Sequence, residues 1–130
     1  MKSLTGREPI FSPFLPGNVF VNFFEKHKRW YCRIGKSMPH ALAVYKHFKG
    51  IPPEGYDVHH INGDATLLEN DNLSNLIAVP KIWNRNYFPH LAREFKLPES
   101  RITEVYVKLV DAVSTDDLFK EVCRHLLTST

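Results

Sequence analysis

The chain has little cysteine and no long apolar run. Its two cysteines, Cys32 and Cys123, are far apart and form no Cys-x-x-Cys pair. This spacing argues against a structural zinc site and against a secreted disulfide framework. No apolar core follows the first residues, and no stretch is long enough to span a membrane. We therefore expect a cytoplasmic protein without membrane contact.

Strong charge and an obvious base-reading helix are also lacking. The net charge of +3 does not by itself indicate a nucleic-acid partner. Residues 1–58 carry nine Lys and Arg against four Asp and Glu, whereas residues 59–130 carry eight against ten. The basic excess in the first half could supply phosphate contacts. Because no helix carries a run of Arg, Asn and Gln, we expect loose sequence preference or a partner.

At 130 residues the chain is long enough to bury a core, so we expect one domain. The Pro-, Phe- and Gly-rich start predicts an extended arm over residues 1–18. A hairpin is expected next, with strands over 18–24 and 29–34. Around it lie five basic residues: Lys26, Lys28, Arg29, Arg33 and Lys36. With Trp30 and Tyr31 they form either a DNA-backbone platform or a surface whose aromatic residues belong to the core.

Residues 39–49 have apolar side chains at helical spacing and predict a helix that packs on this sheet. His40 and His47 lie seven residues apart, on roughly one face of the helix. A second metal site there is one interpretation. Solvated or helix-capping histidines are the favoured one.

The most informative stretch runs from Tyr56 to Asn86. Residues 55–61 predict a strand that ends in His59-His60 and enters an Asn-Gly-Asp turn. Residues 76–79 predict the returning strand, and residues 81–88 a helix that Pro89 should stop or kink. Neighbouring strand side chains point to opposite faces, so the two histidines should have separate tasks.

Only one of two asparagines on the predicted helix can face these histidines. Asn84 and Asn86 are two residues apart, which places them about 200° apart around a helix axis.

This hairpin and helix resemble the HNH endonuclease family, with the closest likeness to the phage- and intron-encoded homing type. The likeness rests on His59-His60, on Asn75-Leu76, and on Asn84 nine residues further. The lead-in over residues 38–56, with its Gly-x-x-Pro-x-Gly-Tyr, adds to it, and the resemblance covers residues 29–86. It implies an α+β fold with small β-hairpins, a ββα-metal (His-Me finger) core and flanking C-terminal helices.

The resemblance also implies roles for individual residues. His60 matches the general base, because a neutral imidazole can accept a proton near pH 7. His59 and Asn84 match the ligands of one divalent metal ion, with Asn86 as the alternative ligand. Asn75 matches the structural asparagine that orients the base. Lys81 and Arg85 flank Asn84 and are interpreted as phosphate contacts.

The metal remains open between Mg²⁺ or Mn²⁺, which we favour, and Zn²⁺ or Ni²⁺. The connection from His60 to Asn75 is longer than in similar proteins, and an extra carboxylate from it would favour a hard cation. The residues of that connection that could reach the site are Asp64, Glu69, Asn70 and Asp71, of which all but Asn70 are carboxylates.

Residues 89–130 predict helices without a chemical motif. A helix is expected over 91–97, another from Glu99 with Ser100 as its cap, and a last one over 118–127. The whole domain then divides into an arm (1–18), a basic hairpin with lead-in helix (19–55), the ββα-metal core (56–88) and C-terminal helices (89–130).

The function implied is a metal-dependent endonuclease that nicks or cuts double-stranded DNA in the host cell. The alternatives are a catalytically silent DNA-binding protein and a structural or host-interaction protein. The C-terminal helices could hold a homodimer or a protein partner.

Overall fold

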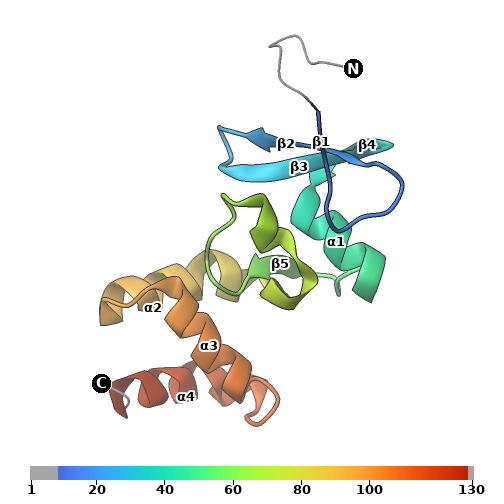
Figure 1. The fold of residues 1–130 in the computed structure, drawn as a ribbon. Coiled ribbons are helices and arrows are strands. Elements are labelled where there is room, and N and C mark those ends of the chain that lie inside the picture. The colour runs from blue at the N-terminus through green and yellow to red at the C-terminus, as the bar shows by residue number, and fades with distance from the viewer. Residues whose placement is uncertain (1–8, 129–130) are drawn as a thin grey trace.

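Two antiparallel sheets organise residues 9–128, the part of the chain that the computed structural model describes (Figure 1). The first sheet has the order β1-β2-β3-β4 and the second pairs β5 with β6. The strands are β1 (Ile10–Phe11), β2 (Phe20–Phe24), β3 (Arg29–Ile34), β4 (Lys36–Pro39), β5 (Tyr56–His60) and β6 (Leu76–Pro80). The α-helices are α1 (His40–Lys49), α2 (Phe88–Phe95), α3 (Glu99–Leu109) and α4 (Thr115–Thr128). This arrangement confirms the α+β class.

The first sheet is larger than the predicted hairpin. β2 and β3 pair as expected, but β1 adds Ile10 opposite Val21, and the backbone N–H of Ser12 donates to the carbonyl of Val19 at 2.7 Å. The described part of the expected arm therefore joins the sheet, while residues 1–8 lie outside the described residues. On the other edge β4 was not predicted. Gly35 has a φ of +75°, which permits the tight turn that returns the chain beside β3.

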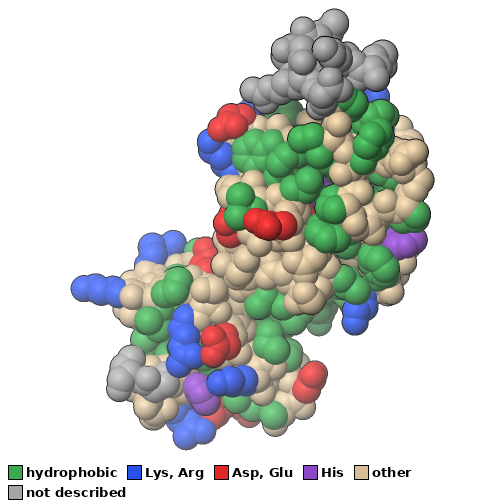
Figure 2. All heavy atoms as spheres, in the orientation of Figure 1, with side chains coloured by type: hydrophobic (Ala, Val, Ile, Leu, Met, Phe, Trp, Pro, Cys, Tyr) green, Lys and Arg blue, Asp and Glu red, His purple; other side chains and the backbone are tan. Residues whose placement is uncertain are grey.

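Helix α1 lies against the first sheet, as Figure 1 shows, and builds a first core. We call this the N-terminal core; its buried residues are Leu15, Val21, Cys32, Ala41, Ala43, Val44 and Leu76. The opposite face of the sheet is open to solvent. Figure 2 shows apolar side chains at the surface over this sheet. Phe11 and Phe20, which pair across β1 and β2, are both exposed.

The β5–β6 hairpin lies between this core and a second one. In the hairpin His59 is opposite Ile77 and His60 is opposite Leu76. Leu76 packs in the N-terminal core, whereas Val79 packs in the second core, which we call the C-terminal core. Its buried residues are Val79, Trp83, Phe88, Leu91, Ile102, Val105, Tyr106, Leu118, Val122 and Leu126. The hairpin thus presents one face to each half of the protein.

The helix after β6 does not stop at Pro89, so of the two predicted effects of this proline, a stop or a kink, the stop was wrong. Helical structure runs from Lys81 to Phe95, with a π-helical turn over Trp83–Tyr87. The N–H of Phe88 bonds to the carbonyl of Trp83, five residues back, and this widened turn precedes the proline ring. Pro89 directly follows this turn as the second residue of α2.

The remaining helices follow the predicted pattern with two differences at their ends. Ser100 does not cap α3, because Pro98 occupies the N-cap position and Ser100 lies inside the first turn. Helix α4 begins at Thr115, and Ser114 Oγ lies 3.0 Å from Asp117 Oδ2 before it. Among residues 9–128 no helix has both the length and the apolar character needed to cross a membrane.

Candidate active site

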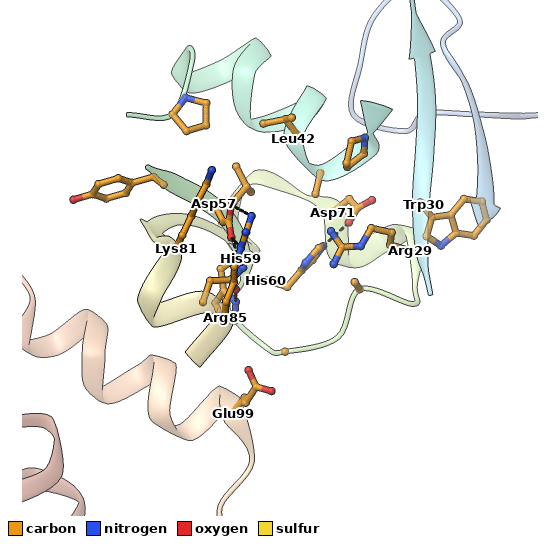
Figure 3. A pocket seen from close by; sticks show the side chains of 18 residues that line it. Arg29, Trp30, Leu42, Asp57, His59, His60, Asp71, Lys81, Arg85 and Glu99 are labelled. Atoms are coloured by element: carbon orange, nitrogen blue, oxygen red, sulfur yellow. Dashed lines mark hydrogen bonds and ion pairs between the residues drawn. The ribbon is translucent and has the colours of Figure 1, made fainter. Parts of the chain in front are cut away.

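A cavity of about 590 Å³ opens beside the β5–β6 hairpin (Figure 3). Its walls come from β3, the start of α1, β5 and the first turns after β6. His59, His60 and Asn84, which the sequence singled out, all line it. The cavity therefore brings together His59 and Asn84, which are 25 positions apart in the chain.

His59 is buried and is held on both ring nitrogens. Its Nδ1 lies 2.8 Å from Asn84 Oδ1, and its Nε2 lies 3.0 Å from Thr103 Oγ1 on α3. The ring also packs against Phe88, with centroids 4.7 Å apart. The position of the imidazole is thus fixed by the C-terminal half of the protein.

The hydrogen-bond directions around His59 follow from its neighbours. Thr103 Oγ1 donates its proton to the carbonyl of Glu99 at 3.0 Å, so it accepts from His59 Nε2–H. In the neutral ring Nδ1 then carries a lone pair. Asn84 Nδ2 donates to Asp57 Oδ2 at 2.9 Å, which turns the acceptor Oδ1 toward His59. Two acceptors therefore face each other across 2.8 Å.

A cation between these two acceptors would satisfy both lone pairs. Protonating His59 is a second solution, but burial lowers the pKa of His59 below its ordinary value and so disfavours the imidazolium. A third solution is the neutral tautomer with its proton on Nδ1, which donates to Asn84 Oδ1 but requires Thr103 Oγ1 to give up its bond to the carbonyl of Glu99 and donate to Nε2. Neighbouring ligands of an octahedral ion with bonds of about 2.1 Å are about 3 Å apart, close to the observed separation. An imidazole nitrogen and an amide oxygen fit a divalent metal ion.

His59 and Asn84 are not part of a larger set of protein side chains that could bind a metal ion. Within residues 9–128, no group of three or more His, Cys, Asp or Glu side chains could hold a metal ion. An ion bound by His59 and Asn84 would keep its other positions for water or substrate oxygens, which is typical of an open site.

Asp57 is a site residue that the sequence interpretation missed. It accepts hydrogen bonds from Asn84 and from Arg85 Nε, the latter at 3.0 Å. Burial alone would raise the pKa of Asp57, but the bonds from Arg85 and Asn84 lower it. Strand alternation could have found this residue, because Asp57 and His59 are two positions apart and share a face of β5.

His60 turns to the opposite side, toward the N-terminal core. Its Nε2 lies 2.6 Å from Asp71 Oδ1, and the residue is 9% exposed. Asp71 is one of the four residues expected to reach the site from the long connection. Asp71 contacts His60 and not the pair His59 and Asn84.

Asn75 ties the two ends of that connection together. Its Oδ1 accepts from the backbone N–H of Asn62 at 3.1 Å, and its Nδ2 donates to the carbonyl of Asn70 at 2.8 Å. Asp64 serves this turn instead of the cavity, since it accepts hydrogen bonds from Thr66. Asn86 is exposed and lines a separate pocket with His90, so Asn84 is the asparagine that faces His59.

The seven predicted DNA contacts divide into two groups. Arg29, Lys81 and Arg85 line the cavity (Figure 3). The other four, Lys26, Lys28, Arg33 and Lys36, are exposed on the first sheet and its turn and are not among the cavity-lining residues.

The aromatic residues of this hairpin have structural contacts. Trp30 packs edge-on against Phe23, and its Nε1 donates to the carbonyl of Thr66 at 3.0 Å. This bond ties the first sheet to the β5–β6 connection. Tyr31 pairs with His27 through its hydroxyl, at 2.8 Å.

His40 is neither solvated nor a helix cap, so the favoured interpretation was wrong for it. It is 0% exposed, and its Nδ1 lies 2.9 Å from Asp71 Oδ2. His47 is exposed, as expected. The helical spacing hid this difference because the partner of His40 comes from a loop 31 residues away.

Residues 40–85 match the family model described as HNH endonuclease. The match confirms the resemblance seen in the sequence and indicates a nuclease-type domain, although it is shorter than the expected 29–86 and leaves out β3. It includes His40, His59, His60, Asp71 and Asn84, whereas Thr103 lies outside it. No curated protein and no solved structure matches the chain.

Proposed function

We propose, with the HNH endonuclease match of residues 40–85 as the premise, that this chain is a metal-dependent endonuclease that hydrolyses phosphodiester bonds in duplex DNA. The observation that carries the proposal is the 2.8 Å approach of His59 Nδ1 to Asn84 Oδ1, which are both acceptors when Thr103 donates to the carbonyl of Glu99. A divalent ion bound there would stabilise negative charge on the scissile phosphate and on the leaving oxygen.

His59 and Asn84 are the proposed ligands, and their neighbours orient them. Thr103 holds the His59 tautomer that leaves a lone pair on Nδ1, and Asp57 holds the amide of Asn84. Such partners keep metal ligands in one orientation. We favour Mg²⁺ or Mn²⁺, because the amide, water and phosphate would all offer oxygen, with Zn²⁺ or Ni²⁺ as the alternative that suits imidazole.

His60 is the proposed general base. Its Nε2 is bonded to Asp71, so Nδ1 is the nitrogen left to take a proton from water in the cavity. Arg29 and Lys81 line the same cavity and would contact the phosphates beside the scissile bond. Asn75 would act indirectly by holding the connection that carries Asp71.

Cleavage of supercoiled plasmid tests the proposal. The wild type should nick the plasmid in Mg²⁺ or Mn²⁺ and not in EDTA, with open circles appearing before linear DNA because one site cuts one strand. His60→Ala should lose about 10²–10⁴-fold in rate while still binding DNA.

The two asparagines supply a matched pair of variants. Asn84→Ala should lose metal-dependent cleavage, whereas Asn86→Ala should keep it. A wild type that stays inert with Mg²⁺, Mn²⁺, Ni²⁺ and Zn²⁺ would refute the nuclease and favour DNA binding without cleavage.

DNA binding is tested separately by its salt dependence. Lys81→Gln should reduce the slope of log K against log salt by about 0.9, since one phosphate contact is lost. Lys120→Gln, at an exposed position of α4 that does not line the cavity, is the control and should leave this slope unchanged.

A further inference from the structure

Four side chains form a line of hydrogen bonds that ends at His60. Ser12 Oγ lies 2.7 Å from His40 Nε2, His40 Nδ1 lies 2.9 Å from Asp71 Oδ2, and Asp71 Oδ1 lies 2.6 Å from His60 Nε2. His40 is 0% exposed and Asp71 is 2% exposed. The line joins the turn after β1, the first residue of α1, the β5–β6 connection and the last residue of β5.

The direction of each hydrogen bond follows from Ser12. Its Oγ accepts the backbone N–H groups of Phe14 at 3.1 Å and Leu15 at 3.0 Å. Both lone pairs are then used, so the hydroxyl proton is donated to His40 Nε2. His40 therefore carries its own proton on Nδ1 and donates it to Asp71.

The carboxylate of Asp71 in turn determines which ring nitrogen of His60 carries the proton. Asp71 accepts from His40 on one oxygen, and its other oxygen accepts from His60 Nε2–H. Burial opposes ionisation, but the hydrogen bonds from His40 and His60 keep the pKa of Asp71 below its ordinary value. An ionised carboxylate can only accept, so His60 is left with its lone pair on Nδ1.

We propose that Asp71 is a positioning residue that fixes the tautomer and ring orientation of His60, and that His40 and Ser12 fix Asp71 in turn. This inference rests on the proposed function for its effect on catalysis, since His60 Nδ1 is the nitrogen that would accept the proton from water. The tautomer itself is a property of the folded protein alone. It is measurable without DNA or metal.

The first experiment is long-range ¹H–¹⁵N NMR on the full chain labelled at histidine nitrogens, at mildly alkaline pH. Variants of the seven histidines assign the signals. His60 should show its proton on Nε2, and His40 should show its proton on Nδ1. A wild-type His60 that carries its proton on Nδ1, or exchanges between both tautomers, overturns the proposal whether or not the protein cleaves DNA.

The second experiment replaces the carboxylate by an amide of the same shape, in Asp71→Asn. An amide accepts on one side and donates on the other, so one of the two histidines has to change its tautomer. Ser12 opposes a change in His40, so His60 should move its proton to Nδ1. We expect kcat to fall about 10–100-fold, with KM and Mn²⁺ affinity within about twofold of the wild type.

Glu69→Gln is the matched control, because Glu69 is an exposed carboxylate of the same connection and is not among the cavity-lining residues. It should leave the His60 tautomer and kcat unchanged. Ser12→Ala acts from the far end of the line and should mix the His40 tautomers with a smaller loss in kcat. A folded Asp71→Asn protein with the wild-type His60 tautomer and wild-type kcat would leave Asp71 a purely structural role and overturn the proposal.

The two proposals fail in different ways. If the wild type has the expected tautomers but cleaves nothing, the nuclease function fails and the tautomer control by Asp71 stands. If the wild type cleaves DNA while Asp71→Asn keeps its kcat, the function stands and the positioning role fails.

Discussion

Replacing Thr103 by valine tests how His59 is prepared for a metal ion. Thr103 is 0% exposed, and valine has nearly the same shape, so the packing of α3 should survive. The substitution removes the acceptor that lies 3.0 Å from His59 Nε2. The buried N–H of His59 then has no partner, at a cost of about 1–3 kcal/mol.

His59 can escape this cost by changing its tautomer. With the proton on Nδ1 it would donate to Asn84 Oδ1, which lies 2.8 Å away. The lone pair needed by a metal would then be lost. Partners of metal ligands typically contribute 10–100-fold in affinity, so Thr103→Val should weaken Mn²⁺ binding by about that factor, or about 1.4–2.8 kcal/mol.

The assay is Mn²⁺ binding followed by electron paramagnetic resonance, together with the Mn²⁺ dependence of plasmid nicking. The nicking curve should move to higher Mn²⁺, with most of the rate recovered at saturation. Thr103→Ser keeps the hydroxyl and should behave as the wild type. If Thr103→Val binds Mn²⁺ with unchanged affinity while folded, the hydroxyl does not select the His59 tautomer and the reasoning is wrong.

Two other predictions concern stability. Burial raises the pKa of Tyr106 from 10.0 to about 12. Between these two values the folded state keeps the phenol proton that the unfolded state has lost. The free energy of unfolding therefore falls as pH rises through this window, by at most about 1.4 kcal/mol per pH unit. Urea unfolding at increasing pH should show a smaller alkaline loss for Tyr106→Phe; equal losses would contradict the assignment. Asn75→Ala removes the amide bonds to Asn62 and Asn70 and should lower the free energy of unfolding by about 1–3 kcal/mol, measured by urea denaturation. A change below the error of that measurement would mean that the connection is held by other contacts.

The local parts of the site could be predicted from the sequence. Alternation along β5 correctly indicated that His59 and His60 point in opposite directions, and the helical angle correctly indicated that Asn84 and Asn86 cannot both face them. These predictions succeeded because each depends on backbone geometry within one element.

The partners that fix the histidines could not be predicted in the same way. Thr103 is 44 residues from His59, and Asp71 is 31 residues from His40. Contacts over such separations depend on how whole elements pack, and a threonine inside an amphipathic helix gives no local signal. The π-helical turn before Pro89 was missed for a related reason, because a proline in a helix pattern ordinarily predicts an end.

The placement of the β5–β6 hairpin between two cores has a consequence for how the protein is made. During synthesis the segments that hold His60, from Ser12 to Asp71, leave the ribosome first, while Thr103, which holds His59, leaves later. In a nascent chain that has not yet exposed α3, the residues that bond to His60 have been made, whereas the Thr103 partner of His59 has not. Under the proposed function, His59 would gain the orientation needed for metal binding only after the C-terminal helices have been made.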